Sequence, residues 1–142
     1  MKRFLCLFLF VCCLTACTYT ADLSNVESLS PVKQELPAMP ERITMELVGA
    51  EAEGCKIRYT NHTGEEWCYG DYFRVDVRLH GQWYHVPNRT DTDIEYTFTA
   101  MAYPILAGES RDMICGFDRY GKLPAGDYRI VTDFGWAEFS LE

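Results

Sequence analysis

Phe73-Arg74-Val75-Asp76-Val77-Arg78-Leu79 is the stretch that decides the fold, because apolar and charged side chains alternate along its whole length. In a β-strand, successive side chains point to opposite faces. The alternation therefore predicts a half-buried strand at residues 73–79. Its inward face holds Phe73, Val75, Val77 and Leu79, and its outward face holds Arg74, Asp76 and Arg78.

Other short apolar runs flank this strand and are separated by Gly, Asn, Asp or Pro at intervals of about ten residues. Residues 80–82 let the chain reverse, and residues 107–110 form a further turn. The predicted strands are residues 43–48, 55–60, 73–79, 83–87, 96–101, 111–115, 127–134 and 137–141. No segment has the period of a long helix, so we expect an all-β, antiparallel β-sandwich of about seven to nine strands.

The composition is that of one acidic globular domain. The chain has 142 residues, of which 48% are apolar, and this length allows one hydrophobic core. Lys and Arg number 13 against 21 Asp and Glu. Nucleic-acid binding draws its affinity from Lys and Arg that neutralise phosphates. The excess of acidic residues therefore argues against a nucleic-acid partner.

The N-terminal residues combine positive charge, an apolar run and a cysteine. Lys2 and Arg3 precede an unbroken apolar run at residues 4–14, which is shorter than the roughly 20 residues of a bilayer-spanning helix. The run ends in Leu14-Thr15-Ala16-Cys17, which resembles the bacterial lipobox. We therefore expect residues 1–16 to be a lipoprotein signal peptide and Cys17 to carry a lipid. The protein would then be anchored to the cell membrane on its extracytoplasmic face. The alternative is a plain secretory signal, which leaves Cys17 as an ordinary thiol.

Residues 17–41 carry serines and prolines among scattered charges and show no sustained period of a helix or a strand. This pattern predicts a flexible tether between the lipidated Cys17 and a folded domain at residues 42–142. Removal of residues 1–16 takes away Lys2 and Arg3 and leaves 11 basic against 21 acidic residues, a net charge of −10.

Four stretches of the predicted domain resemble one known family. They are Glu66-Trp67-Cys68-Tyr69-Gly70-Asp71-Tyr72, Gly81-Gln82-Trp83-Tyr84-His85-Val86-Pro87, Ala107-Gly108-Glu109-Ser110 and residues 120–131. In combination they are similar to the bacterial immunoglobulin-like domains of lipoproteins and membrane-sensor ectodomains, chiefly of Gram-positive bacteria. The resemblance implies an immunoglobulin-like antiparallel β-sandwich with no catalytic residues and no cofactor.

One part of the resemblance concerns a single tyrosine. Leu123, the turn Pro124-Ala125-Gly126 and Tyr128 resemble the tyrosine corner of Greek-key sandwiches. The resemblance implies a structural role for Tyr128, whose hydroxyl would bond a nearby backbone group across the corner.

Cys55, Cys68 and Cys115 stand where this family does not usually place cysteines. Outside the cytoplasm a disulfide is chemically allowed. Cys55 and Cys115 lie on strands that are neighbours in immunoglobulin-like topologies, so they are one candidate pair. A pair that includes Cys68 and three buried free thiols are the alternatives. A redox role would need a partly exposed thiol.

Trp67, Tyr69 and Trp83 belong to an aromatic-rich segment that could stack on sugars or peptides. The alternative is that they pair across strands in the core. The histidines and cysteines lack the short spacing of a zinc site, and residues 91–95 lack the glycine and distal glutamate of a calcium loop, so we expect no metal site. The chain has neither a Gly-x-Ser-x-Gly elbow nor a protease-like cysteine signature, so we do not expect an enzyme.

Together these features predict a non-catalytic, lipid-anchored extracytoplasmic module for binding or adhesion at the cell surface. Its partners besides the membrane would be a surface protein or a wall polymer. The first alternative is an accessory or sensory subunit that modulates a membrane-bound partner. A redox- or metal-handling lipoprotein is a less favoured interpretation.

Overall fold

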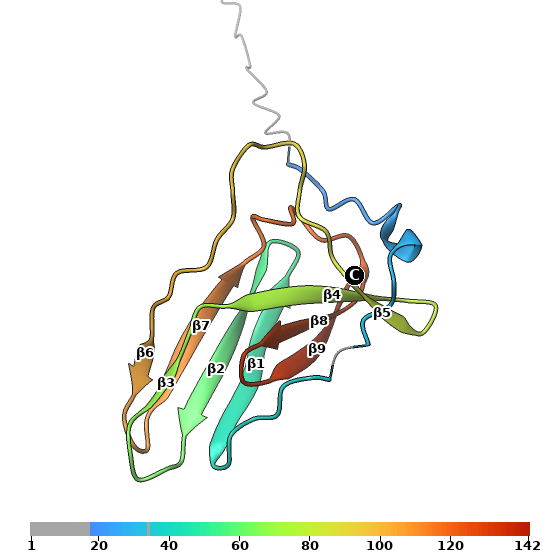
Figure 1. Cartoon of the computed structure of the whole chain (residues 1–142). Helices are drawn as coiled ribbons and strands as arrows, with labels where there is room; N and C mark the ends of the chain where they lie inside the picture. The colour runs from blue at the N-terminus through green and yellow to red at the C-terminus, as the bar shows by residue number, and fades with distance from the viewer. Residues whose placement is uncertain (1–17, 34) are drawn as a thin grey trace, which may run out of the picture.

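Two antiparallel β-sheets pack face to face in this chain (Figure 1). The computed structural model describes residues 18–33 and 35–142, so the expected signal peptide and Cys17 lie outside the described residues. Within the described part, one short 3-10 helix and nine strands follow each other along the chain. They are η1 (Val26–Ser28), β1 (Ile43–Glu51), β2 (Gly54–Asn61), β3 (Trp67–Tyr69), β4 (Phe73–Leu79), β5 (Gln82–His85), β6 (Tyr103–Ile105), β7 (Ser110–Gly116), β8 (Gly126–Thr132) and β9 (Trp136–Leu141).

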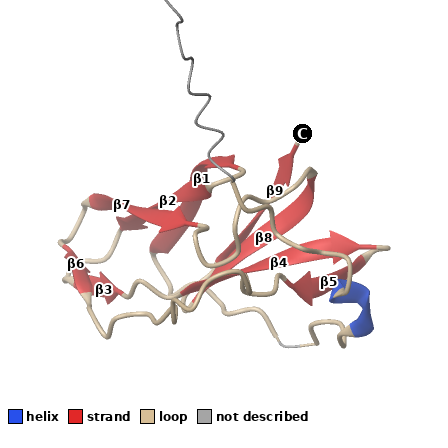
Figure 2. Cartoon of the chain, turned by 90° about the horizontal axis from the view of Figure 1, so that it is seen from above, coloured by secondary structure: helices blue, strands red, loops and turns tan. Residues whose placement is uncertain are grey.

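The sheets differ in size and strand order. The first has the order β1-β2-β7 and the second has the order β5-β4-β8-β9, while β3 and β6 form a separate pair at one end of the sandwich (Figure 1, Figure 2). Every pairing between these strands is antiparallel. The prediction of an all-β antiparallel sandwich of about seven to nine strands is therefore confirmed.

The strand predicted from residues 73–79 is β4, and its apolar face points into the core. Phe73, Val75 and Val77 are buried and lie opposite the inward residues of β8. The outward face differs from the expectation, because Asp76 on that face has no exposed surface. Its carboxylate accepts a hydrogen bond from the buried Arg129, and this partner makes burial of the charge tolerable.

A two-residue turn at His80 and Gly81 joins β4 to β5. Leu79 pairs with Gln82, and the two turn residues have φ values of 49° and 79°. Positive φ at both central residues defines a type I′ turn, whose twist matches that of antiparallel strands. The reversal expected at residues 80–82 is therefore a tight hairpin.

The β-prone stretch at residues 96–101 is a loop rather than the expected strand, and the sequence did not predict the short strands β3 and β6. Within this loop, Phe98 packs edge-on against Tyr72 and Phe73, with ring centroids 5.0 and 5.5 Å apart. These aromatic contacts hold the loop against the domain without a neighbouring strand, so the local preference for a strand is not realised.

A buried hydrogen bond joins the two sheets through the core. The Tyr59 hydroxyl of β2 donates to Oγ1 of Thr132 of β8 at 2.8 Å, and both residues are buried. Burial raises the pKa of Tyr59 to about 12, so the phenol stays protonated at neutral pH. Besides Tyr59, the largest fully buried side chains of the described residues are Tyr128, Phe117, Ile57, Ile105, Leu123 and Ile130.

Tyr128 lies near the start of β8 and has no exposed surface. Its hydroxyl donates a 2.8 Å hydrogen bond to the carbonyl of Pro124, at a sequence separation of 4. This is the backbone contact that a tyrosine corner makes at the start of such a strand. The bond ties the loop before β8 to the strand that follows it.

Where the sequence predicts a flexible tether over residues 17–41, several described residues before β1 contact the domain. Thr20 forms a parallel bridge with Lys122. The Ala21 N–H donates to the Lys122 carbonyl, and the Lys122 N–H donates to the Tyr19 carbonyl, each at 2.8 Å. Within the described residues, the polypeptide therefore already contacts the folded domain at residues 19–21.

The same segment continues beside β5, where η1 lies (Figure 2). Val26 of η1 is 1% exposed, whereas Leu29 just after it is 50% exposed. Further on, the Val32 N–H donates to the Trp83 carbonyl at 2.8 Å. The sequence did not reveal this packing because an aperiodic segment can still bury single apolar side chains, and the surface that it meets decides which ones.

Val26→Asp should detach this segment from the domain, because a carboxylate without a partner is costly to bury. Limited proteolysis should then cut residues 18–33 several-fold faster than in the wild type. Leu29→Asp is the matched control, since Leu29 is already half exposed. Equal cleavage of the two variants would contradict the packing of Val26.

Tyr128→Phe removes only the hydroxyl that bonds Pro124. It should lower the free energy of unfolding by about 1 kcal/mol in urea denaturation. Tyr103→Phe is the control, because the Tyr103 hydroxyl lies on the exposed side, 4.0 Å from the Met101 sulfur. A loss for Tyr128→Phe no larger than that of the control would show that the corner bond does not stabilise the fold.

Candidate functional site

The three aromatic residues considered for ligand contact do not form one surface. Tyr69 is 4% exposed and belongs to the core. Trp67 is partly buried, with its ring centroid 5.1 Å from that of Phe134. Trp83 lies on β5 of the other sheet, with its ring over the guanidinium of Arg129. Tyr69 is therefore a core residue, and Trp67 and Trp83 lie in separate environments.

Cys55 and Cys115 lie directly opposite each other on β2 and β7. They are 6% and 0% exposed, and both thiols are free in the structure. The neighbouring Cys55 thiol and burial raise the pKa of the Cys115 thiol, which keeps it protonated and a poor nucleophile. Cys68 on β3 is free and exposed. Cys55 and Cys115 are thus neighbours on adjacent strands, and their burial shields them from exchange with thiols in solution.

In the native chain, an alkylating reagent should modify Cys68 well before Cys55 and Cys115, because Cys68 is the exposed one of these three. Peptide mass mapping measures each site separately. Unfolding without a reductant then decides the pairing. If the unfolded chain is then alkylated at both Cys55 and Cys115, the two thiols were free. If the peptides that contain them are recovered as one cross-linked species, they form a disulfide. Native alkylation of all three at the same rate would contradict the burial of the pair.

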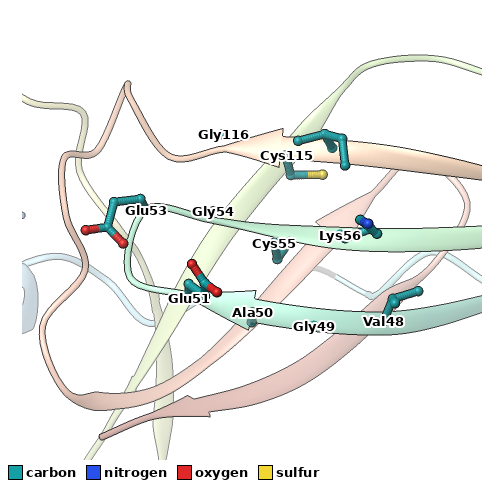
Figure 3. Close-up of a pocket in the computed structure, with 11 residues that line it drawn as sticks. Val48, Gly49, Ala50, Glu51, Glu53, Gly54, Cys55, Lys56, Cys115 and Gly116 are labelled. Carbon is teal, nitrogen blue, oxygen red and sulfur yellow. The ribbon is translucent and has the colours of Figure 1, made fainter.

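An open cavity of about 550 Å³ lies at one end of the three-stranded sheet, between β1, β2 and β7 (Figure 3). The pairing of β1 with β2 skips Val48, which bulges at this point. Val48 and Ile114 are 43% and 68% exposed. Glu51, Glu53 and Lys56 also line the cavity. This open surface therefore combines exposed apolar side chains with charged ones.

Asp76 is the centre of a buried charged cluster that the sequence analysis missed. Its Oδ2 accepts a 2.8 Å hydrogen bond from Arg129 Nε, and its Oδ1 lies 2.7 Å from His85 Nδ1. Arg74 Nε lies 3.5 Å from the same Oδ1. Asp76 and Arg129 are 0% and 5% exposed. They are direct neighbours across β4 and β8, so the cluster is an interior ion pair built on the two central strands.

Trp83 covers the cationic side of this cluster, with its ring centroid 4.5 Å from Cζ of Arg129. A guanidinium over an aromatic face is stabilised by the ring quadrupole. The sequence holds one signal that could have indicated the cluster. Arg129 is a lone cation between Tyr128 and the apolar Ile130 and Val131. These residues belong to β8, which is buried on both faces.

Neither a metal centre nor a membrane-spanning helix is present in the part of the chain that the structure describes. No three His, Cys, Asp or Glu side chains of residues 18–33 and 35–142 gather closely enough to hold a metal ion. Over the same residues, no helix has the length and apolar composition that crossing a bilayer requires.

Asp76→Asn should lower the free energy of unfolding by roughly 3–5 kcal/mol, because it leaves the Arg129 charge buried and uncompensated. Asp112→Asn is the matched control. Asp112 also bonds an arginine, Arg58, through both carboxylate oxygens, but this pair lies on an exposed face. Its loss should cost at most about 1 kcal/mol. Urea denaturation at neutral pH measures both, and similar values for the two variants would contradict the structural importance of Asp76.

Comparison with known proteins identifies the domain. The family described as Bacterial Ig-like domain matches residues 41–142. The match begins just before β1 and includes all nine described strands. No curated protein matches the chain, and no solved structure matches it.

Proposed function

Because the chain belongs to the family of bacterial Ig-like domains, we propose that it is a non-catalytic binding or adhesion module at the cell surface. In this proposal a lipid on Cys17 holds the module on the extracytoplasmic face of the membrane. The observation that carries the proposal is the family match over residues 41–142. Domains of this family are typically non-catalytic surface modules.

The anchor is supported by the residues that precede the family match. Lys2 and Arg3, the apolar run at residues 4–14 and Leu14-Thr15-Ala16-Cys17 have the order of a lipoprotein signal. Each buried methylene of an acyl chain contributes about 0.8 kcal/mol, so two or three chains would hold the protein stably without a membrane-spanning helix.

The packing of the N-terminal segment sets how far the domain would stand from the membrane. The chain meets the domain at Tyr19, whose carbonyl accepts the Lys122 N–H. Two residues of extended chain span about 7 Å. A lipid on Cys17 would therefore place the Lys122 end of the sandwich directly at the membrane surface, and the β3-β6 end would be free.

The net charge narrows the class of partner. With residues 1–16 removed, 11 basic residues face 21 acidic ones. Such a domain repels polyanions, including nucleic acid and strongly anionic polymers. A surface protein or a wall polymer of low negative charge fits this domain better.

Metabolic labelling tests the anchor. Labelled palmitate should enter the wild-type chain but not Cys17→Ala, and globomycin should block processing of the wild type. Cys68→Ala is the matched control, because Cys68 is an exposed cysteine within the folded domain. Label that persists in Cys17→Ala would refute lipidation at this residue.

Chemical cross-linking on intact cells tests the binding role separately. The wild-type protein should give a discrete cross-linked species that Cys17→Ala, released from the membrane, gives in a smaller amount. Recovery of no specific protein or glycan with either form would count against a binding module and would leave the anchor untouched.

A further inference from the structure

A second cavity, of about 390 Å³, lies on the other sheet, beside the buried charged cluster. It is formed by the start of β4, the end of β5, the loop between β5 and β6, and the loop before β8. The side chains that matter here are Tyr72, Arg74, His85, Asn88, Phe98 and Arg119. The cavity therefore combines two arginines with an aromatic wall.

Three nitrogen atoms of the two arginines are buried without a hydrogen-bond partner. They are Nε and Nη2 of Arg74 and Nε of Arg119. Buried polar groups in folded proteins nearly always have partners, and a donor left without one is costly. Unsatisfied donors at a cavity therefore indicate a missing acceptor.

Two other arginines of this protein use the same donors to hold a carboxylate. Arg58 holds Asp112 through Nε and Nη2 at 2.7 and 3.1 Å, and Arg89 holds Asp91 through the same two atoms at 2.6 Å each. Arg74 has this pair of donors free. Two parallel N–H groups match the two oxygens of a carboxylate.

Nearby protein groups do not fill this role. Asp76 Oδ1 lies 3.5 Å from Arg74 Nε, too far for a good hydrogen bond, and its closer partners are Arg129 and His85. Arg119 donates from Nη2 to the Tyr96 carbonyl at 3.0 Å, which leaves Nε unused.

Charge and shape around the cavity favour a small anion. Arg74 and Arg119 line the cavity, no carboxylate is among its described lining residues, and the neighbouring Asp76 is already paired with Arg129. Phe98 lies under the Arg119 guanidinium, 4.5 Å from Cζ, and contacts Tyr72 edge-on. The acidic surroundings repel polyanions, whereas a small ligand with one negative charge can enter.

We propose that this cavity binds a small carboxylate-bearing molecule, with its carboxylate held by Arg74 and Arg119 and its apolar part against Tyr72 and Phe98. The proposal rests on the binding role proposed above but is independent of the lipid anchor. It names the chemical class of ligand that the module recognises.

Isothermal titration of the full-length chain in a neutral detergent tests the proposal, with benzoate as the probe. Benzamide has the same shape without the charge and should bind at least about tenfold more weakly, because it lacks the negative charge and the second acceptor oxygen that pair with a guanidinium. Benzoate binding no tighter than benzamide would overturn the proposal. Tighter binding of phenyl phosphate than of benzoate would overturn the assignment to carboxylates.

Arginine variants locate the site. Arg74→Gln and Arg119→Gln should each weaken benzoate binding by about ten- to a hundredfold. Arg58→Gln is the matched control, because Arg58 is engaged by Asp112 on the other sheet, and it should bind benzoate like the wild type.

Circular dichroism checks that each variant is folded. Arg74 lies beside Asp76, so its loss could unfold the domain. Arg119 lies in a loop. If Arg74→Gln is unfolded, the benzoate affinity of Arg119→Gln decides the outcome. Wild-type affinity in a folded Arg119→Gln would overturn the proposal. The palmitate and cross-linking experiments do not depend on this cavity, so failure of benzoate binding is distinguishable from failure of the proposed function.

Discussion

The carboxylate of Asp76 lies on the outer face of β4 with no exposed surface, so the protein itself must balance its charge. Arg129 does so from the neighbouring strand at 2.8 Å. Arg129 is in turn covered by the ring of Trp83, and the Trp83 carbonyl accepts the N–H of Val32 from the N-terminal segment. The ion pair and its aromatic cover therefore account for the burial of Arg129 on the outer face of β8, and the N-terminal segment bonds the edge strand β5 that carries Trp83.

Local patterns were sufficient to predict the architecture. The alternation at residues 73–79 predicted β4 and the side chains that it buries, and the turn residues His80 and Gly81 predicted the hairpin that follows. Both depend on residues close in sequence. The β-prone stretch at residues 96–101 shows the limit, because a strand also needs a neighbour to pair with, and there the rings of the core hold the chain as a loop instead.

The site was less predictable, because its parts come from distant segments. The topology placed Cys55 and Cys115 on adjacent strands, and the structure adds that they are directly opposed and buried. Nothing in the sequence links Arg74 with Arg119, which line one cavity at the start of β4. In the same way, the burial of Asp76 depends on what covers the outer face of the sheet. The alternation of residue types along β4 does not show that cover.

The packed N-terminal segment also determines how the domain responds to force. Tension applied at the N-terminal end acts on the two backbone hydrogen bonds between residues 19–21 and Lys122 before it reaches the buried Val26. These contacts can open while both sheets remain paired. Release of residues 21–42 would add about 70–80 Å of extended chain. Under load, the protein would therefore lengthen before β1 is pulled from its sheet, so that the first extension leaves the fold intact.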